Sequence, residues 1–275
     1  MNTSTWSDLG ITLRRPHGEQ HVRCPSPACA DKRAPSLSAN PDKGVFVCHR
    51  CGWSGRVGSA SDWLGDQLER IQKADRERDK ARDTAASNAS ALWHSAGRAM
   101  WHEYLKRKAV LPLGIRQRDR LLVIPMFDSD GRLWNCQTID QAGDKRFLRG
   151  GRTQGLYYPI RGDSHAIYVC EGFATGAALH LYFEKHAQVA VAFNCGNLIH
   201  VAKALREKYP GTPLAIAADN DQWTAGNPGL THARQAAAAV GAKVIYPKFN
   251  GLDVGGRPTD FCDLHLLQRE AVRVG

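Results

Sequence analysis

Short apolar runs separated by helical stretches characterise the C-terminal part of the chain. The runs at 166–170, 189–193 and 214–218 are apolar, partly β-branched and bounded by turn residues, which is typical of buried strands. An Ala- and Leu-rich stretch at 175–185 separates the first two and has helical character. Strand, helix and strand in succession are typical of a parallel sheet covered by helices. The pattern predicts an α/β fold with a mainly parallel sheet in 166–275.

Acidic residues follow two of these predicted strands. Glu171 comes directly after the first run, and Asp219 and Asp221 follow the third. The ends of parallel strands lie along one edge of a sheet, so these side chains are expected to converge in one crevice. Three carboxylates there would repel one another without a divalent cation, and their hard oxygen ligands suit Mg²⁺. The alternative is that an Asp-rich turn is only a helix cap or loop, which is weaker for two turns in register.

The N-terminal part of the chain contains two cysteine pairs. Cys24 and Cys29 are separated by four residues, and Cys48 and Cys51 by two. Pairs on tight turns present four thiolates tetrahedrally to one zinc ion. Short strand-like runs between the pairs favour a ribbon, and metal binding would supply the folding energy of so small a segment. The alternative is four unrelated thiols.

Basic and aromatic residues surround the cysteine pairs. Arg33, Arg50 and Trp53 are the residues that we expect to contact DNA. Cations that hold phosphates beside rings that stack on bases are what single-stranded DNA recognition requires. The structural alternative places the aromatic rings in the small core of the ribbon.

The middle of the chain changes composition twice. Residues 59–90 mix acids and bases with few apolar positions, which is typical of a solvated helix or hinge. An Asp-Ser-Asp-Gly turn at 128–131 between apolar runs predicts a hairpin. Lys145, Arg146 and Arg149 then form a basic stretch. It either approaches phosphate groups or is a solvated surface loop, and local evidence gives the two interpretations equal weight.

Charge and composition narrow the class of protein. The 275 residues carry a net charge of +10, which favours a polyanionic partner such as nucleic acid, although many basic proteins bind no such partner. No apolar run approaches the ~20 residues of a membrane helix, and the N-terminus lacks the features of a signal peptide. We therefore expect a cytoplasmic protein with no membrane contact, whose eight cysteines are reduced.

Several segments together resemble one protein family. Residues 171–177 (Glu-Gly-Phe-Ala-Thr-Gly-Ala), 219–221 (Asp-Asn-Asp) and 259–265 (Thr-Asp-Phe-Cys-Asp-Leu-His) resemble the Toprim domain of primases, with Cys262 where Asn is usual. Residues 24–53 resemble the N-terminal zinc ribbon of phage primases, and 102–108 resemble the His-x-Tyr-Leu segment before their catalytic core. The chain thus resembles Toprim-type DNA primases of phages and plasmids, without a fused helicase.

The resemblance implies a domain organisation and an activity. The implied domains are a template-binding zinc ribbon at 17–58, a linker at 59–90, an N-terminal subdomain of the catalytic core at 91–165 and a Toprim domain at 166–275. The implied activity is synthesis of short RNA primers from ribonucleoside triphosphates on single-stranded DNA, with one structural Zn²⁺ and catalytic Mg²⁺ or Mn²⁺. The assigned residues are Glu171, Asp219 and Asp221 for catalysis; the same three with Asp260 and Asp263 for magnesium; and Lys145, Arg146, Arg149 and Gly172 for nucleotide or template.

Two rival functions share parts of this pattern. Bacterial recombination mediators join a four-cysteine zinc site to a Toprim-like fold without polymerising nucleotides, and Toprim nucleases share the carboxylates. The full acidic set and the basic region before it favour the primase. Because the sequence contains no Gly-x-x-x-x-Gly-Lys-Ser/Thr loop, we expect a separate replicative helicase as a partner.

Overall fold

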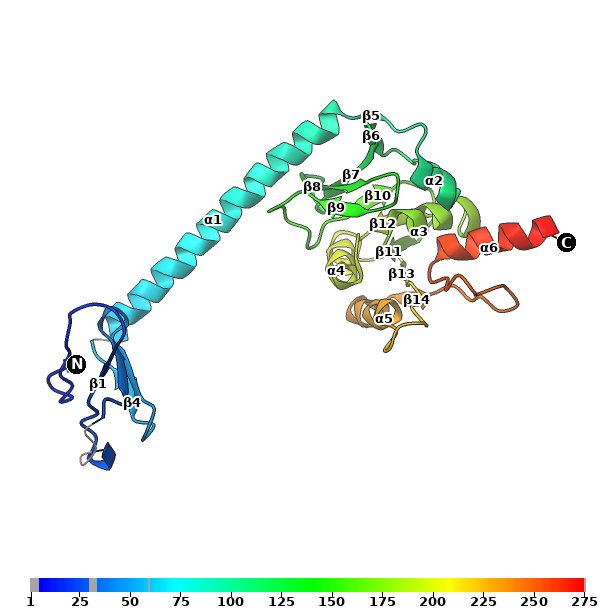
Figure 1. Cartoon of the computed structure of the whole chain (residues 1–275). Coiled ribbons are helices and arrows are strands. Elements are labelled where there is room, and N and C mark those ends of the chain that lie inside the picture. Colours follow the sequence, from blue (N-terminus) through cyan, green and yellow to red (C-terminus); the bar gives the residue numbers. More distant parts are fainter. Residues whose placement is uncertain (1–4, 30–33, 59, 275) are drawn as a thin grey trace. The chain divides into compact units, whose positions relative to one another are not determined.

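The computed structural model describes residues 5–29, 34–58 and 60–274, except for the side chains of 60–68 and 274. The chain divides into two compact units, Met1–Glu77 and Arg78–Gly275. The long helix α1 (Ala60–Ser95) contains the division between them (Figure 1). No helix within the described ranges is both long and apolar enough to cross a bilayer.

The first unit contains a four-stranded antiparallel sheet in the order β1-β2-β3-β4. Phe46 and Cys48 on β3 point into a small core while Val47 between them is exposed, as the period of a strand requires. Ile11, from the segment before the ribbon, is buried in the same core. The elements are β1 (Gln20–Val22), β2 (Leu37–Asn40), β3 (Val45–Cys48), β4 (Ser54–Arg56) and two 3₁₀ turns, Pro27–Cys29 and Pro41–Lys43.

The second unit begins with an antiparallel sheet in the order β5-β6-β7-β8-β9. The hairpin between β7 and β8 forms at the predicted turn, where Asp128 Oδ1 accepts hydrogen bonds from the backbone N–H groups of Asp130 and Arg132. The elements are β5 (Gly97–Arg98), α2 (Glu103–Lys108), β6 (Arg116–Arg118), β7 (Leu121–Phe127), β8 (Leu133–Ile139) and β9 (Lys145–Phe147).

A second sheet in this unit has the order β10-β12-β11-β13-β14. Its pairs β11–β12, β11–β13 and β13–β14 are parallel, and only β10–β12 is antiparallel. The predicted α/β fold with a mainly parallel sheet is therefore confirmed. The elements are β10 (Tyr158–Ile160), β11 (Ile167–Cys170), α3 (Phe173–Ala178), a π-helical turn (Leu179–Phe183), β12 (Gln188–Val191), a 3₁₀ turn (Cys195–Asn197), α4 (Leu198–Lys208), β13 (Leu214–Ala217), α5 (Pro228–Val240), β14 (Lys243–Ile245) and α6 (Phe261–Val274).

Both faces of the parallel sheet are covered by helices. On β11, Cys170 packs into the core that contains α3 and α6, while Val169 packs into the core that contains α4 and α5. Gly176 makes the first of these contacts possible, because a Cβ there would lie 3.0–3.2 Å from Val191, Cys170 and Val189. The strand sequences are continuous apolar runs because both faces of the sheet are buried.

The regions expected to form a linker and an N-terminal subdomain share cores with later elements of the chain. Leu122 and Ile124 of β7 belong to the same hydrophobic cluster as Phe173 of α3. Ala89, in the last turns of α1, is fully buried and packs with Val123 and Cys136. The end of the charged helix is therefore part of the second unit.

Candidate active site and metal centre

The four cysteines of the first unit form one cluster. Cys24 Sγ lies 3.9 Å from Cys51 Sγ, and Cys29 Sγ lies 3.9 Å from Cys48 Sγ. All four sulfur atoms lie within 4.8 Å of one another. Thiolates around one zinc ion at a Zn–S distance of ~2.3 Å stand about 3.8 Å apart, so this spacing fits a tetrahedral site. The cluster is able to bind one zinc ion, as the cysteine spacing predicts.

Local backbone geometry presents these sulfurs, and one hydroxyl supports them. Cys48 ends β3, and the turn after it closes where the Gly52 N–H donates to the Cys48 carbonyl over 2.9 Å. Burial raises the pKa of Cys24 to about 12. The Ser36 hydroxyl, 3.3 Å from Cys48 Sγ, together with backbone hydrogen bonds from Cys51 and Arg50, lowers the pKa of Cys48 to about 5, which favours the thiolate that zinc binds.

The residues of the ribbon expected to bind DNA have different environments. Arg50 is exposed, whereas Trp53 is half-buried with its ring centroid 4.5 Å from that of Phe46. Trp53 therefore packs on the ribbon core as well as presenting part of its ring to solvent. Arg33 lies outside the described residues.

Glu171 and Asp219 leave two neighbouring strands at the same edge of the parallel sheet. Cys170 at the end of β11 pairs with Ala217 at the end of β13. The chain passes from β11 to β12 on one side and then returns to β13 on the other, which makes this edge a topological switch point. Ligands of open α/β sheets bind at such points. The fold thus brings these two acids together as the strand pattern predicts.

Both acids are half-buried, and each has one buried oxygen that lacks a hydrogen-bond partner. Glu171 Oε1 and Asp219 Oδ1 are buried and have no hydrogen-bond partner. Burial, reinforced by the charge of Asp221, raises the pKa of Glu171 to about 7. Burial, reinforced by Glu171 and Asp260, raises the pKa of Asp219 to about 9. Such orphaned and mutually repelling oxygens are costly unless a positive ligand meets them.

Asp221 is held at the start of α5. Its Oδ2 accepts a hydrogen bond of 2.9 Å from the backbone N–H of Gly229. A Cβ on Gly229 would lie 2.6 Å from the Asp219 carbonyl oxygen and 2.8 Å from Asp221 Oδ2. Only glycine permits this approach, so the long loop after Asp221 folds back onto the acidic turn.

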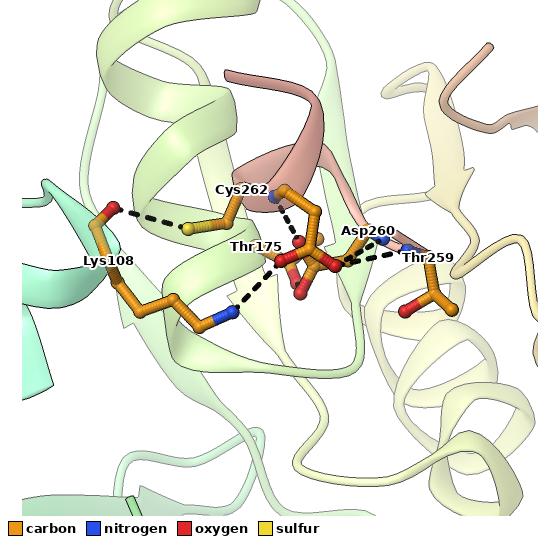
Figure 2. Close-up of polar contacts among 6 residues, drawn as sticks. Lys108, Thr175, Thr259, Asp260 and Cys262 are labelled. Atoms are coloured by element: carbon orange, nitrogen blue, oxygen red, sulfur yellow. Dashed lines mark hydrogen bonds and ion pairs between the residues drawn. The ribbon is translucent and has the colours of Figure 1, made fainter. Parts of the chain in front are cut away.

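Asp260 and Asp263 cap the start of α6 (Figure 2). Asp260 Oδ1 accepts from the backbone N–H of Asp263 over 2.7 Å, and Asp263 Oδ2 accepts from the N–H of Thr259 over 3.0 Å. Asp260 Oδ2 also accepts from the Thr175 hydroxyl over 3.2 Å, and Asp263 Oδ1 pairs with Lys108 Nζ at 3.0 Å. Burial raises the pKa of Asp260, and the charge of Asp263 adds to the effect. Asp260 faces the acidic cavity, whereas both oxygens of Asp263 are engaged outside it.

A cavity of about 370 Å³ joins the acids to a set of cations. Its lining includes Glu171, Asp219 and Asp260, and also Lys145 on β9. Lys145 Nζ approaches the first turn of α3, since a Cβ on Gly172 would lie 3.7 Å from it. Two further cations line the cavity, Arg107 and Lys108, for which the sequence analysis predicted no role. Arg146 and Arg149 are exposed and outside the lining.

The sequence held only weak signals for the additional residues. Arg107 and Lys108 end a short helix in a run of three bases, which is common on solvated surfaces. Phe193 also lines the cavity and adopts a left-handed backbone conformation with φ of 72°, which a bulky residue rarely adopts. No local pattern indicates that conformation.

The chemistry of the acidic residues fits a hard divalent cation. Within the described residues, the cysteines are the only set of three or more ligand side chains already gathered within 4.8 Å. The acids are therefore not a closed cage. Mg²⁺ in phosphoryl-transfer sites is commonly bound by one or two carboxylates together with water and substrate phosphates. The orphaned oxygens of Glu171 and Asp219 provide two such carboxylates.

The fold and the site define a class: a four-cysteine ribbon joined to an α/β unit whose sheet edge carries half-buried acids that line one cavity with cations. Comparisons with known proteins add names to this class. The chain is 42% identical over 142 residues to a DNA primase TraC of Escherichia coli, covering 48% of this chain and 13% of that protein. It is 42% identical over 135 residues to another DNA primase TraC of Escherichia coli, covering 46% and 9%. This chain thus spans only a small part of the length of these relatives.

Family models and solved structures give weaker matches than these sequence relatives. No protein-family model matches the chain. The zinc-binding and RNA polymerase domains of the Aquifex aeolicus primase align over 96% of this chain and 79% of that one, with 17% identity and a TM-score of 0.44. The primase fragment of the bacteriophage T7 primase–helicase aligns over 92% and 97%, with 15% identity and a TM-score of 0.40. Because these TM-scores lie below 0.5, we base the functional proposal on the site and on the sequence matches.

Proposed function

We propose that this chain is a DNA primase that joins ribonucleotides into short primers on single-stranded DNA. The observation that carries the proposal is the cavity in which Glu171 and Asp219, each with a partnerless buried oxygen, face Lys145. Nucleotidyl transfer requires carboxylates for a cation and basic groups for phosphates within one site. The matches to DNA primase TraC over about half of the chain support this choice of reaction.

In the proposed reaction, the 3′-hydroxyl of one nucleotide attacks the α-phosphorus of the next, and pyrophosphate leaves. Glu171 and Asp219, with Asp221 and Asp260 beside them, would hold Mg²⁺ or Mn²⁺. When bound, this cation lowers the pKa of the attacking hydroxyl and offsets the charge of the leaving group. Glu171 is the residue that we assign to accept the proton, because its carboxyl group lines the cavity beside the proposed cation site.

The cations of the cavity provide the binding half of the mechanism. Lys145, on the exposed strand β9, is positioned to hold the triphosphate beside the first turn of α3. Arg107 is oriented by hydrogen bonds of 2.7 and 2.9 Å to the carbonyl groups of Gln141 and Ala142. Arg146 and Arg149 are exposed and outside the cavity lining, and we assign them to the template. Arg50 and Trp53 of the ribbon are separate candidates for contact with DNA.

Primer synthesis on single-stranded DNA with ribonucleotides and Mg²⁺ tests the proposal. Wild-type chain should yield short RNA products, and Asp219→Ala should abolish them. Asp163→Asn, which changes an exposed carboxylate, is the matched control and should leave them unchanged. A wild-type chain that binds DNA but makes no product on varied templates would replace the enzyme by a non-catalytic DNA-binding module. Adding a replicative helicase tests the expected partner, since a productive contact should raise the product yield.

A further inference from the structure

Residues 259–263, at the start of α6, connect three elements that build the acidic site, and Figure 2 draws the contacts with Lys108 and Thr175. From the helix after Glu171, the Thr175 hydroxyl donates to Asp260 Oδ2 over 3.2 Å. From the turn between Asp219 and Asp221, the backbone N–H of Asn220 donates to the Thr259 carbonyl over 2.7 Å. The direction in which Asp260 faces the cavity therefore depends on how this segment is held.

The end of α2 contributes the remaining connection. Lys108 Nζ lies 3.0 Å from Asp263 Oδ1, and both side chains are half-buried. The carbonyl group of Lys108 also accepts a contact of 3.3 Å from the buried thiol of Cys262. Ala109, with φ of 50°, closes the helix directly after Lys108. The two residues before Lys108 have other environments. Lys106 is exposed, and Arg107 donates hydrogen bonds to loop carbonyl groups.

Hydrogen bonds connect Asp263 to Asp260. Its second oxygen, Oδ2, accepts from the backbone N–H groups of Thr259 and Asp260, at 3.0 and 3.5 Å. The Asp263 N–H donates in return to Asp260 Oδ1 over 2.7 Å, which completes a reciprocal cap at the helix start. An ion pair that fixes Asp263 therefore also fixes the carboxylate of Asp260.

We propose that Lys108 is a positioning residue: through its ion pair with Asp263 it holds Asp260 against the cavity and thereby sets the cation affinity of the acidic site. This inference rests on the cation site of the proposed function. Lys108 acts on the carboxylates through Asp263 and not on the nucleotide. Supporting groups of this kind orient ligands, and their loss typically lowers metal affinity by about 10–100-fold.

Two substitutions that remove charges of opposite sign distinguish a positioning role of Lys108 from a purely electrostatic one. Lys108→Met removes a positive charge near the acids, and Asp263→Asn removes a negative one. If the pair acted only through its charges, or if Asp263 itself bound the cation, the first change would strengthen Mn²⁺ binding and the second would weaken it. Positioning predicts that both weaken binding, because either change releases the same cap.

The experiment is an Mn²⁺ titration of the full-length, zinc-loaded chain, followed by electron paramagnetic resonance of the free ion. Each single variant should weaken binding about tenfold or more, and the double variant should be no weaker than the weaker single one. Lys106→Met, on the exposed face of the same helix, should bind like wild type. Circular dichroism of each variant verifies that the unit is folded.

The outcomes separate this inference from the proposed function. Shifts of opposite sign, additive losses or unchanged affinity in both single variants would overturn the positioning role, as would a wild-type chain that binds no Mn²⁺. Primer synthesis by the same preparations is read separately. A wild-type chain that binds Mn²⁺ and shows the predicted coupling but makes no primer would overturn the primase and leave the positioning role standing.

Discussion

Replacing Asp219 by asparagine removes a charge that the folded chain accommodates poorly without a cation. The carboxyl group is buried beside Glu171 and Asp260, which raises its pKa from 3.8 to about 9. The unfolded chain releases this proton near pH 4, whereas the folded chain retains it. The side chain therefore contributes stability at low pH that is progressively lost as the pH rises towards 9.

The size of the effect can be worked out from the pKa values. Each pH unit between the two pKa values corresponds to about 1.4 kcal/mol. At pH 8 Asp219 therefore lowers the free energy of unfolding by at most about 6 kcal/mol. The neighbouring carboxyl groups share protons and relieve part of it, so we expect Asp219→Asn to raise the free energy of unfolding by about 2–3 kcal/mol at pH 8. At pH 5 the gain should be smaller, because the pH is then only about one unit above the pKa of the unfolded chain and the upper bound falls to about 2 kcal/mol.

Calorimetric unfolding of the zinc-loaded chain without added Mg²⁺ measures this difference for the unit Arg78–Gly275. A gain of this size raises the melting temperature by about 4–12 °C in a unit of this length. Added Mg²⁺ should stabilise wild type and not the variant, because the ion binds only the native acidic site. Asp163→Asn is again the exposed control. A variant as stable as wild type at pH 8, or a gain that does not grow with pH, would refute the electrostatic account of the site.

Three further changes test other parts of the structure. Cys48→Ser should reduce the zinc content from one ion per chain to none and unfold the ribbon, as measured by metal analysis and near-ultraviolet dichroism; full zinc retention would contradict the four-thiolate site. Gly229→Ala should destabilise the second unit by about 1–3 kcal/mol, although alanine ordinarily favours a helix, because its Cβ would collide with Asp219 and Asp221; chemical denaturation measures the sign. Glu171→Gln should lower the rate of primer synthesis at least about a hundredfold with little change in DNA affinity, and a normal rate would exclude it as the base.

Much of the fold and part of the site can be predicted from local patterns. Short apolar runs bounded by turn residues and separated by helical stretches predicted the parallel sheet, because burial on both faces of a sheet requires continuous apolar strands. The cysteine pairs identified the zinc cluster, since two tight turns of fixed spacing suffice to present four sulfurs. Glu171 and Asp219 were found because an acid after a parallel strand always emerges at the same sheet edge.

The tertiary structure alone decided which charges meet. Lys108 and Asp263 are 155 residues apart in sequence, and no local period relates them. A run of three basic residues looks the same in sequence whether it is solvated or, as for Arg107 and Lys108, lines a cavity. The same holds for α1, whose charged sequence predicts a solvated linker although Ala89 near its end is fully buried. Secondary structure depends on contacts between residues close in sequence, whereas the partners of a charge are set by how distant elements pack.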